Sequence, residues 1–340
     1  MDPLTHALLG GTLAHTGFRN KLGHRSVWLG ALGAMLPDLD MIAILPMGTW
    51  GEFVHHRGFT HSLGFGPVVG PLLGYGVWRW HQRKGEITPL KAWMGLFVLA
   101  LLSHSLLDAF TSYGTQLLSP FSNHRFAWDA VPIIDPFYSL LLLIPVILGT
   151  QKRIAPNIQR GIAISALLLS TCYLFCGLFM NLHAEQEAAC QLSSEGISSA
   201  QIRSYPTILQ IFLRRLVVRT NNQIQVGHLS LWKPRPIHWQ TYTPPKHPLI
   251  DKLAQTREGE IFVWFAMGQI APHLVEKEDG FIVELDDLRY GLPGTPDRGL
   301  WGIRAQLDSH GNLLPPIVRF DRPLPEKPLT ILKQLFYATF

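Results

Sequence analysis

The sequence predicts an α-helical polytopic membrane domain of about five to six helices, followed by a soluble β-rich domain. Two observations lead to this fold class. Charged residues make up 16% of the chain, whereas globular proteins usually carry about 25%. The deficit is also uneven, because residues 1–182 are apolar with their charges in short clusters, while residues 183–340 read as an ordinary soluble domain. We therefore place the domain boundary after residue 182.

The apolar segments of the first domain have the lengths that membrane helices need. A bilayer core takes about 20 apolar residues in helical conformation. Residues 92–110 and 162–182 meet this requirement without interruption. Residues 63–80 and 133–149 are shorter or contain Gly and Pro, and we expect them to be further spans. These segments predict a chain that crosses the membrane several times.

The segment at 28–47 is long enough to span but carries the motif PDLD at its centre. Proline removes a helix donor, and two carboxylates at bilayer depth are costly. We therefore expect a broken helix whose break faces protein or water, with an extended backbone after Pro37 that turns Asp38 and Asp40 to one side. A turn on the outer surface is the alternative interpretation. Residues 3–18 predict a short helix that penetrates the bilayer part-way.

Lysine and arginine in the short loops predict the orientation of the helices, since cytoplasmic loops carry an excess of both. Three basic clusters mark these loops: Arg19, Lys21 and Arg25; Arg79, Arg83, Lys84 and Lys91; and Lys152, Arg153 and Arg160. Residues 48–62 and 111–132 then form external loops, and residues 183–340 lie outside as well. No basic run is long enough to indicate nucleic acid, so the expected partner is the lipid bilayer, and the oligomeric state stays open.

The C-terminal part contains alternating apolar and polar stretches that are typical of β-strands. Turn-forming segments rich in Pro and Gly separate them. The stretches are ILQIFLRRLVVRT at 208–220, QIQVGHLSLW at 223–232, EIFVWFAMG at 260–268 and GFIVELDDLRYG at 280–291. They predict a small, mostly antiparallel sheet domain.

Ionisable side chains of the predicted membrane domain gather on its external side. Such groups are costly at membrane depth and usually functional. His104 and Asp108 are four residues apart in one span, so both project from the same helix face. The whole set comprises His6, Asp38, Asp40, His55, His56, His61, His104 and Asp108. Because a scatter of tolerated polar residues would not keep to one side, we interpret the set as a single site.

Imidazoles and carboxylates without thiolates are typical ligands of Zn²⁺, and also of Mn²⁺ and Fe²⁺. The set exceeds one tetrahedral site, so we expect a divalent metal as one ion or as two ions about 3.5–4 Å apart. Other interpretations stay open for single residues. His55 fits a solvated loop side chain, and His6 fits a histidine at a helix end. His104 and Asp108 could also form a neutral hydrogen-bonded pair.

Side chains of the external loops extend the predicted site. Arg57 is expected to bind an anion through its guanidinium group. Gly58 would allow a tight turn, and Thr60 would cap the helix that follows. Asp129 is the candidate for proton transfer. A second group stays open between a layer around the ligands and contacts to a substrate: His124, Arg125, Asp129 and Asp135.

Five motifs in sequence order carry a resemblance to a known family: MDPLTHALLG, LGAMLPDLD, HRGFTHS, SHSLLD and GTQLLSPFSNHRFAWDAVPIIDP. Over roughly residues 1–180 the chain resembles the bacterial inner-membrane metal-dependent hydrolases of the YdjM type, some of them LexA-regulated. The resemblance implies a multi-helix inner-membrane protein with a metal centre, distantly similar to zinc-dependent phospholipase C and P1 nuclease. The ligands that it implies are His6, Asp38, Asp40, His56, His61, His104 and Asp108.

Together these observations predict a membrane-bound metal-dependent hydrolase. It would cleave a phosphoester of a lipid or lipid-linked substrate with metal-activated water at the outer leaflet. Arg57 would stabilise the charge on the transferred group, and Asp129 would move protons. Two alternatives remain: a proton- or ion-coupled transporter that uses the His and Asp side chains as a relay, and a membrane anchor with a structural metal.

Overall fold

A computed structural model describes the chain except for residues 198–200, 234, 293–296, 323–327 and 340. The described residues form two compact units. One consists of Met1–Leu178 with Ile208–Gln210, and the other of Phe179–Thr207 with Ile211–Phe340. The first unit is helical, and the second contains the β-strands. The predicted fold class, a helical region followed by a β-rich domain, is therefore confirmed.

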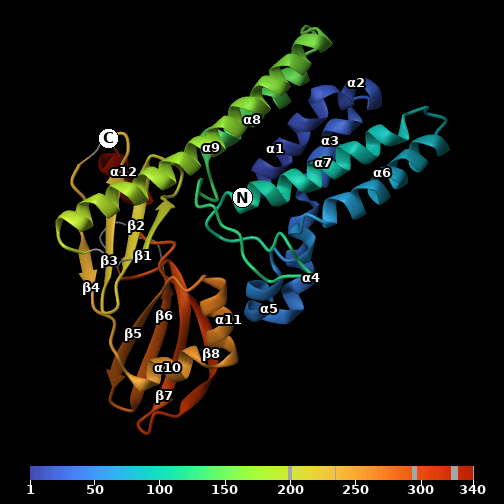
Figure 1. Cartoon of the computed structure of the whole chain (residues 1–340). Helices are drawn as coiled ribbons and strands as arrows, with labels where there is room; N and C mark the ends of the chain where they lie inside the picture. Colours follow the sequence, from blue (N-terminus) through green and yellow to red (C-terminus); the bar gives the residue numbers. More distant parts are fainter. Residues whose placement is uncertain (198–200, 234, 293–296, 323–327, 340) are drawn as a thin grey trace. The chain divides into compact units, whose positions relative to one another are not determined.

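Helices of several kinds follow one another in the first unit (Figure 1). In order they are α1 (Pro3–Leu13), η1 (Ala14–Phe18), α2 (Arg19–Leu22), α3 (Arg25–Met35), η2 (Leu36–Leu39), α4 (Asp40–Ile44), η3 (Leu45–Met47), α5 (Gly48–His55), η4 (Phe59–His61), α6 (Phe65–Arg83), α7 (Leu90–Ala109), α8 (Pro136–Gly149) and α9 (Pro156–Ser194). The residues of α9 from Phe179 onwards belong to the second unit. The starts of α1 and α8 follow from sequence, because Asp2 and Asp135 cap them and a proline occupies the first helical position.

Two expectations about the segment from 28 to 62 are wrong. The motif at 37–40 does not become extended; its first three residues belong to the 3₁₀ turn η2, and its last residue, Asp40, opens α4. The α-helix is interrupted at this motif as expected, but by a 3₁₀ turn, in whose first turn a proline loses no hydrogen bond. Residues 48–62 are not simply a loop either, since α5 occupies Gly48–His55.

Close backbone contact holds α6 against α7, as Figure 1 shows for the two neighbouring helices. Gly66, Gly70 and Gly74 recur every four residues on the α6 face that meets α7. A Cβ atom built on Gly74 would lie 2.5 Å from the backbone nitrogen of Met94. Small residues at such intervals are the usual means by which membrane helices approach closely. They fix the position of α7, which carries His104 and Asp108.

Three helical stretches in the described residues are long and apolar enough to cross a membrane: Arg25–His55, Leu90–Ala109 and Pro156–Ser194. The other two predicted spans do form helices, α6 and α8, but neither belongs to these three. The helix α8 has 14 residues and falls below the length of a full span.

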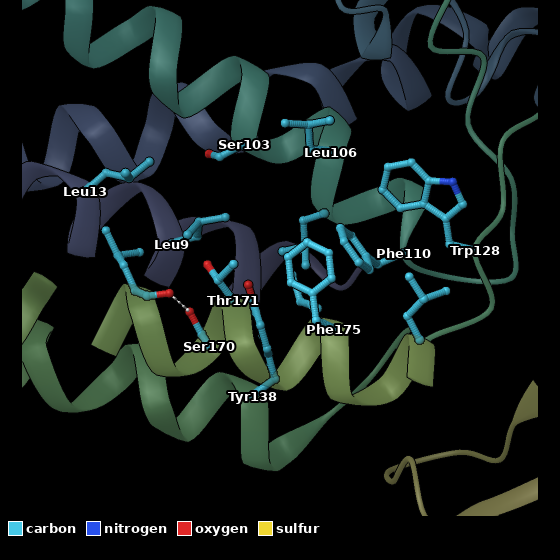
Figure 2. A pocket seen from close by; sticks show the side chains of 14 residues that line it. Leu9, Leu13, Ser103, Leu106, Phe110, Trp128, Tyr138, Ser170, Thr171 and Phe175 are labelled. Carbon is cyan, nitrogen blue, oxygen red and sulfur yellow. Dashed lines mark hydrogen bonds between the residues drawn. The ribbon is translucent and has the colours of Figure 1, made fainter. Parts of the chain in front are cut away.

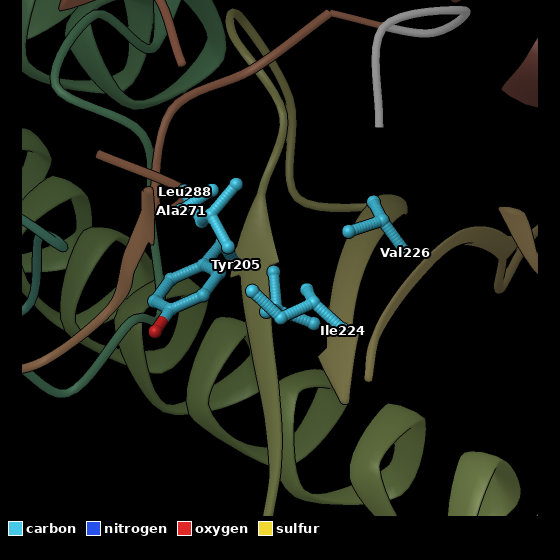
Figure 3. Packing of buried hydrophobic residues seen from close by; sticks show 6 residues of the cluster. Tyr205, Ile224, Val226, Ala271 and Leu288 are labelled. Atoms are coloured by element: carbon cyan, nitrogen blue, oxygen red, sulfur yellow. The ribbon is translucent and has the colours of Figure 1, made fainter. Parts of the chain in front are cut away.

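The second unit contains two four-stranded antiparallel sheets. The first joins β1 (Gln201–Pro206), β2 (Leu213–Arg219), β3 (Ile224–Ser230) and β4 (Gln240–Tyr242) in chain order, and the second joins β5 (Ile270–Lys277), β6 (Gly280–Asp287), β7 (Trp301–Asp308) and β8 (Leu313–Asp321) in chain order. Three helices accompany them: α10 (Pro248–Ala254), α11 (Arg257–Phe265) and α12 (Pro328–Thr339). Side chains of both sheets share one core, in which Tyr205, Ile224 and Val226 pack with Ala271 and Leu288 (Figure 3).

One predicted strand is wrong. The stretch at 260–268 lies mostly in the helix α11. Thr256 caps this helix by accepting a hydrogen bond from the Gly259 amide at 3.0 Å, and two glutamates follow in the first turn. Phe262 and Phe265, three residues apart, are buried on one face. The capping residue Thr256 lies outside the stretch at 260–268, and the alternating pattern within that stretch alone favours a strand.

Candidate metal centre

Four of the predicted ligands meet at one point: Asp38, His61, His104 and Asp108. Each offers one ligand atom, and the four atoms lie within 4.8 Å of one another. They come from three elements, since η2 carries Asp38, η4 carries His61, and α7 carries the other two. His61, His104 and Asp108 are buried, whereas the Asp38 side chain is 19% exposed. Asp38 therefore marks the side from which solvent can reach the cluster.

The distances between the ligand atoms suit a tetrahedral ion. His61 Nε2 lies 3.3 Å from Asp38 Oδ1 and 3.3 Å from Asp108 Oδ2. His104 Nε2 lies 3.5 Å from Asp38 Oδ1 and 3.6 Å from Asp108 Oδ2. A tetrahedral zinc with bonds of about 2.0–2.1 Å has ligand atoms about 3.3–3.4 Å apart. The cluster is thus close to the size that such an ion requires.

The ring of His104 is oriented by the backbone of α3. Its Nδ1 lies 2.6 Å from the carbonyl oxygen of Ala34. A carbonyl only accepts, so Nδ1 donates and the neutral ring keeps its lone pair on Nε2. That atom is buried and has no hydrogen-bond partner among the described residues. The orientation is the one in which a histidine ligand is normally held.

The ring of His61 is oriented by side chains of η4 and α4. The Thr60 hydroxyl donates to Asp40 Oδ2 at 2.9 Å, and His61 Nδ1 lies 3.0 Å from the same hydroxyl. Since the hydroxyl proton is engaged with Asp40, Nδ1 donates to Thr60, and the neutral ring then keeps its lone pair on Nε2, which faces Asp38 Oδ1 at 3.3 Å. Thr60 therefore orients His61 and does not cap the following helix, since α6 has Gly64 at its N-cap and no side-chain cap.

The remaining predicted ligands surround the four-atom cluster. Asp40 lies on the far side of His61, with Oδ2 3.4 Å from Nδ1, and it accepts from His56 Nδ1 at 2.9 Å. His6 Nε2 lies 3.2 Å from Asp108 Oδ1, and its ring stacks on that of His104 with centroids 3.7 Å apart. These three residues contact the ligands without belonging to the cluster. His55 is exposed.

The chemistry of the cluster fits a cation. Two imidazole lone pairs and two carboxylates face one another in a largely buried space, which is unfavourable without a positive charge between them. His104 Nε2 and Asp108 Oδ2 are buried without a hydrogen-bond partner in the described part of the chain. Asp108 is nevertheless ion-paired, through Oδ2 with Arg57 and through Oδ1 with the amino group of Met1. These unsatisfied acceptors, all nitrogen or oxygen, suit a divalent ion of borderline hardness. The four side chains could hold a metal ion.

Arg57 lies beside the cluster and is itself buried. Its Nε is 3.1 Å from Asp108 Oδ2, and its Nη1 donates to the Thr111 hydroxyl at 2.8 Å. The guanidinium also stacks over the Tyr113 ring at 4.6 Å from the centroid. The backbone of Arg57 has a φ of +59°, a strained value for a side chain of this size. Gly58 is needed for space rather than for φ, because a Cβ there would lie 2.7 Å from the His55 carbonyl.

The loop from 111 to 135 supplies the other predicted side chains. Asp129 is buried with a φ of +51°, and its neighbours Trp128 and Ala130 donate amide hydrogen bonds to the carbonyls of Ala109 and Phe110. Its backbone therefore lies beside the C-terminal end of α7, the end of the helix that carries Asp108.

Two further residues of this loop, Arg125 and Asp135, have structural contacts. Arg125 donates to the Gly114 carbonyl at 2.8 Å, and Asp135 caps α8 while accepting from the Tyr173 hydroxyl at 2.8 Å. His124 is exposed.

Sequence reasoning missed the groups that orient the ligands. The Ala34 carbonyl is a backbone group and leaves no trace in the sequence. Thr111 and Tyr113, which hold Arg57, follow directly after the motif at 103–108, so their nearness to Asp108 could have singled them out.

Fold and cluster together define a class, a helical membrane protein whose buried Asp and His side chains could hold a metal ion. A sequence model described as "YdjM inner membrane protein" matches residues 1–184, and the chain belongs to this family. The match covers the helices that carry the cluster. Membership places the chain among inner membrane proteins.

Two relatives match parts of the chain. The "Inner membrane protein YbcI" of Escherichia coli (strain K12) is 41% identical over 113 residues, which are 32% of this chain and 62% of YbcI. The "Uncharacterized protein YfhP" of Bacillus subtilis (strain 168) is 28% identical over 148 residues, which are 40% of this chain and 42% of YfhP. The matched region spans less than two thirds of either relative. No solved structure matches the chain.

Proposed function

We propose that the chain is a metal-dependent hydrolase that cleaves a phosphoester in a membrane lipid or lipid-linked substrate. One observation supports this most strongly: four nitrogen and oxygen ligand atoms face one point, at 3.3–3.6 Å for the four closest pairs. A divalent ion at such a site lowers the pKa of a bound water to about 7 and so supplies hydroxide at neutral pH.

The proposed ligands are Asp38, His61, His104 and Asp108, and the proposed ion is Zn²⁺, with Mn²⁺ and Fe²⁺ as the other candidates. Asp40, His56 and His6 are proposed to hold and orient these ligands rather than to bind the ion. Partners of this kind fix the ring orientation of ligand histidines, and their loss typically weakens metal binding by about 10–100-fold.

Arg57 and Asp129 are the proposed residues for charge and protons. The Arg57 guanidinium is a fixed positive charge 3.1 Å from Asp108 Oδ2. It would stabilise the negative charge of a phosphoryl group bound beside Asp108. Asp129 is buried at the end of α7, where a carboxylate could take a proton from water or return one to the leaving group.

The proposed location of the reaction is the outer leaflet. The basic loops predict that the cluster and the β-rich domain face the periplasm. The first, helical unit of the structure is called the membrane unit below. A site in this unit suits a substrate that arrives sideways from the bilayer.

A structural metal in a membrane anchor is the second candidate function. It is favoured by the number of ligands, because four protein ligands complete a tetrahedron, and structural zinc sites are closed in this way. Catalysis needs a further position for water. The partial exposure of Asp38 favours such a position on its side of the cluster.

The test uses the full-length chain purified in detergent and loaded with Zn²⁺. Phosphate release is measured on a panel of phospholipids and lipid-linked phosphate esters, for the parent and for Asp38→Ala and His104→Ala. We expect turnover by the parent that both substitutions abolish. Asp286→Asn, in the other unit, is the matched control and should keep the activity. Bound metal without turnover on any substrate of the panel would favour the structural role.

A further inference from the structure

A partly open apolar cavity of about 540 Å³ lies in the membrane unit, beside the candidate metal centre (Figure 2). The helices α1, α7, α8 and α9 and the loop at Trp128 line it. Its volume falls within the roughly 300–1,000 Å³ that is usual for ligand pockets. None of its lining residues is charged.

Two hydroxyl groups of the lining are already engaged by their own helices. The Ser103 hydroxyl donates to the Ala100 carbonyl at 3.0 Å, and the Ser170 hydroxyl donates to the Leu167 carbonyl at 3.1 Å. Ligands with hydrogen-bonding groups would find little to bind here. The cavity suits a hydrocarbon.

The cavity and the metal centre share α7 as a common wall. Ser103 and Leu107 line the cavity, and each precedes a proposed ligand, His104 and Asp108. Successive residues of an α-helix are about 100° apart, so the two sites lie on adjacent faces of one helix. On α1, His6 contacts Asp108, and Leu9 lines the cavity less than one turn later.

One end of the cavity lies at the same end of α7 as Asp108. Phe110 and Trp128 line it there, and the Trp128 amide donates to the Ala109 carbonyl at 2.8 Å. Figure 2 shows these two rings at one end of the cavity and Leu13 towards the other. Tryptophan is typical of the level at which lipid headgroups meet hydrocarbon.

We propose that this cavity binds one fatty acyl chain of a membrane phospholipid, with the headgroup at the Trp128 end and the chain running along α7. Two of its walls, α7 and α9, belong to helices that are apolar and long enough to span a bilayer, so acyl chains are the surrounding solvent. Binding of the acyl chain does not depend on the proposed function. The placement of the phosphoester of that lipid at the metal centre does rest on it.

The experiment uses the full-length chain and a phospholipid with a diazirine near the end of one acyl chain. After irradiation, the labelled peptides are mapped by mass spectrometry. We expect labelling at lining residues of α7 and α9 that saturates as the probe fraction in the detergent rises. A polyprenyl phosphate with the same photoreactive group is the second probe and should label these residues less.

Two substitutions fill the cavity, Thr171→Trp and Ser103→Phe, and one matched control, Leu168→Trp, places the same indole on the exposed side of α9. Either filling substitution should lower the labelling of the lining about tenfold, a difference equal to about 1.4 kcal/mol in binding. The control should leave it unchanged. Retained metal content shows that each variant is folded.

Three results would overturn the proposal: labelling that rises in proportion to the probe without saturating, labelling spread equally over outward side chains such as Leu168, or stronger labelling by the polyprenyl probe. The saturation measurement needs no variant, so it decides even if both filled proteins misfold. Because labelling needs no turnover, saturable labelling without hydrolysis contradicts the proposed function alone, and hydrolysis without such labelling contradicts this inference alone.

Discussion

Each of the two units contains a cluster of buried carboxylates, and the two clusters are neutralised differently. In the β-rich unit, Glu284 and Asp286 lie on β6 and meet three guanidinium groups. Arg298 contacts Glu284 at 2.8 Å, Arg304 donates to Glu284 at 2.7 Å, and Arg322 contacts Asp286 at 3.0 Å. The positive charges that these carboxylates require are supplied by the chain itself.

In the membrane cluster, formed by Asp38, His61, His104 and Asp108, the chain supplies cations to one of the two carboxylates. Asp38 and Asp108 face His61 and His104, whose oriented rings present lone pairs. Arg57 and the amino group of Met1 both contact Asp108, whereas the described ion pairs of Asp38 involve His61 and His104 alone. Buried carboxylates are stable only when they are paired or bound to a metal. The comparison teaches that a carboxylate without a cationic partner, here Asp38, and not the presence of carboxylates as such, indicates a metal ion.

The largest expected effect comes from removing a proposed ligand. We expect Asp108→Asn to lower hydrolysis by roughly 10³-fold or more, because the ion supplies several kcal/mol of transition-state stabilisation. Phosphate release by the full-length protein is the measurement, and Asp286→Asn is the matched carboxylate in the other unit. Equal losses in both variants would show that the two clusters do not differ in the proposed way.

The second-largest expected effect comes from a residue that orients a proposed ligand without binding the ion. Asp40→Asn should weaken zinc binding by about 10–100-fold, since it loosens the hold on His61 without removing a ligand. Competition with a chelating dye measures the affinity. Thr60→Ser keeps the hydroxyl that bridges Asp40 and His61 and should bind zinc as the parent does. An unchanged affinity in Asp40→Asn would mean that Asp40 has no part in orienting the ligand.

The helix packing that positions α7 can be disturbed away from the cluster. Gly74→Ala should destabilise the membrane unit by about 1–3 kcal/mol, because its Cβ would overlap the backbone of α7 at Met94. Gly76 lies on the same helix, and a Cβ there meets nothing within 4 Å. Thermal unfolding in detergent should therefore separate Gly74→Ala from Gly76→Ala. Equal stability of the two variants would contradict the tight contact of α6 with α7.

The pH dependence of the stability of the β-rich unit tests the carboxylate cluster that the arginines neutralise. Burial raises the pKa of Asp286 to about 6, although the nearby Arg322 opposes the shift. The folded state therefore holds this proton more tightly than the unfolded state, whose carboxyl has an ordinary pKa near 3.9. The contribution to stability is fully present below about pH 4 and falls by up to about 3 kcal/mol as the pH rises through 6.

Hydrogen exchange of the β6 amides, corrected for the intrinsic rate, measures this change between pH 4 and pH 7. Asp286→Asn carries no titrating proton and should flatten the dependence. If the variant and the parent lose protection equally over this range, another group is responsible.

Much of this architecture could be predicted from local patterns. The spacing of His104 and Asp108 needs only the helical repeat, and the apolar lengths at 92–110 and 162–182 predicted helices that are present as parts of α7 and α9. The motif at 37–40 was harder, because a proline is compatible with an extended chain and with a 3₁₀ turn, and tertiary contacts with His61 decide between them.

The parts that could not be predicted depend on contacts between distant residues. The role of Thr60 is set by Asp40, twenty residues earlier, and that of His104 by a carbonyl seventy residues away. At 260–268 an alternating pattern matched a strand equally well, and the cap at Thr256 outweighs it. The apolar cavity arises from four helices at once and has no sequence signature.

The most direct test of the central claim is elemental analysis of the full-length protein purified in detergent without chelator. The four converging ligand atoms, and the lack of a cationic partner for Asp38, predict about one divalent ion per chain. The ion should be lost in Asp38→Ala and retained in Asp286→Asn. A parent protein without bound metal, or an Asp38→Ala variant that keeps it, would contradict the account.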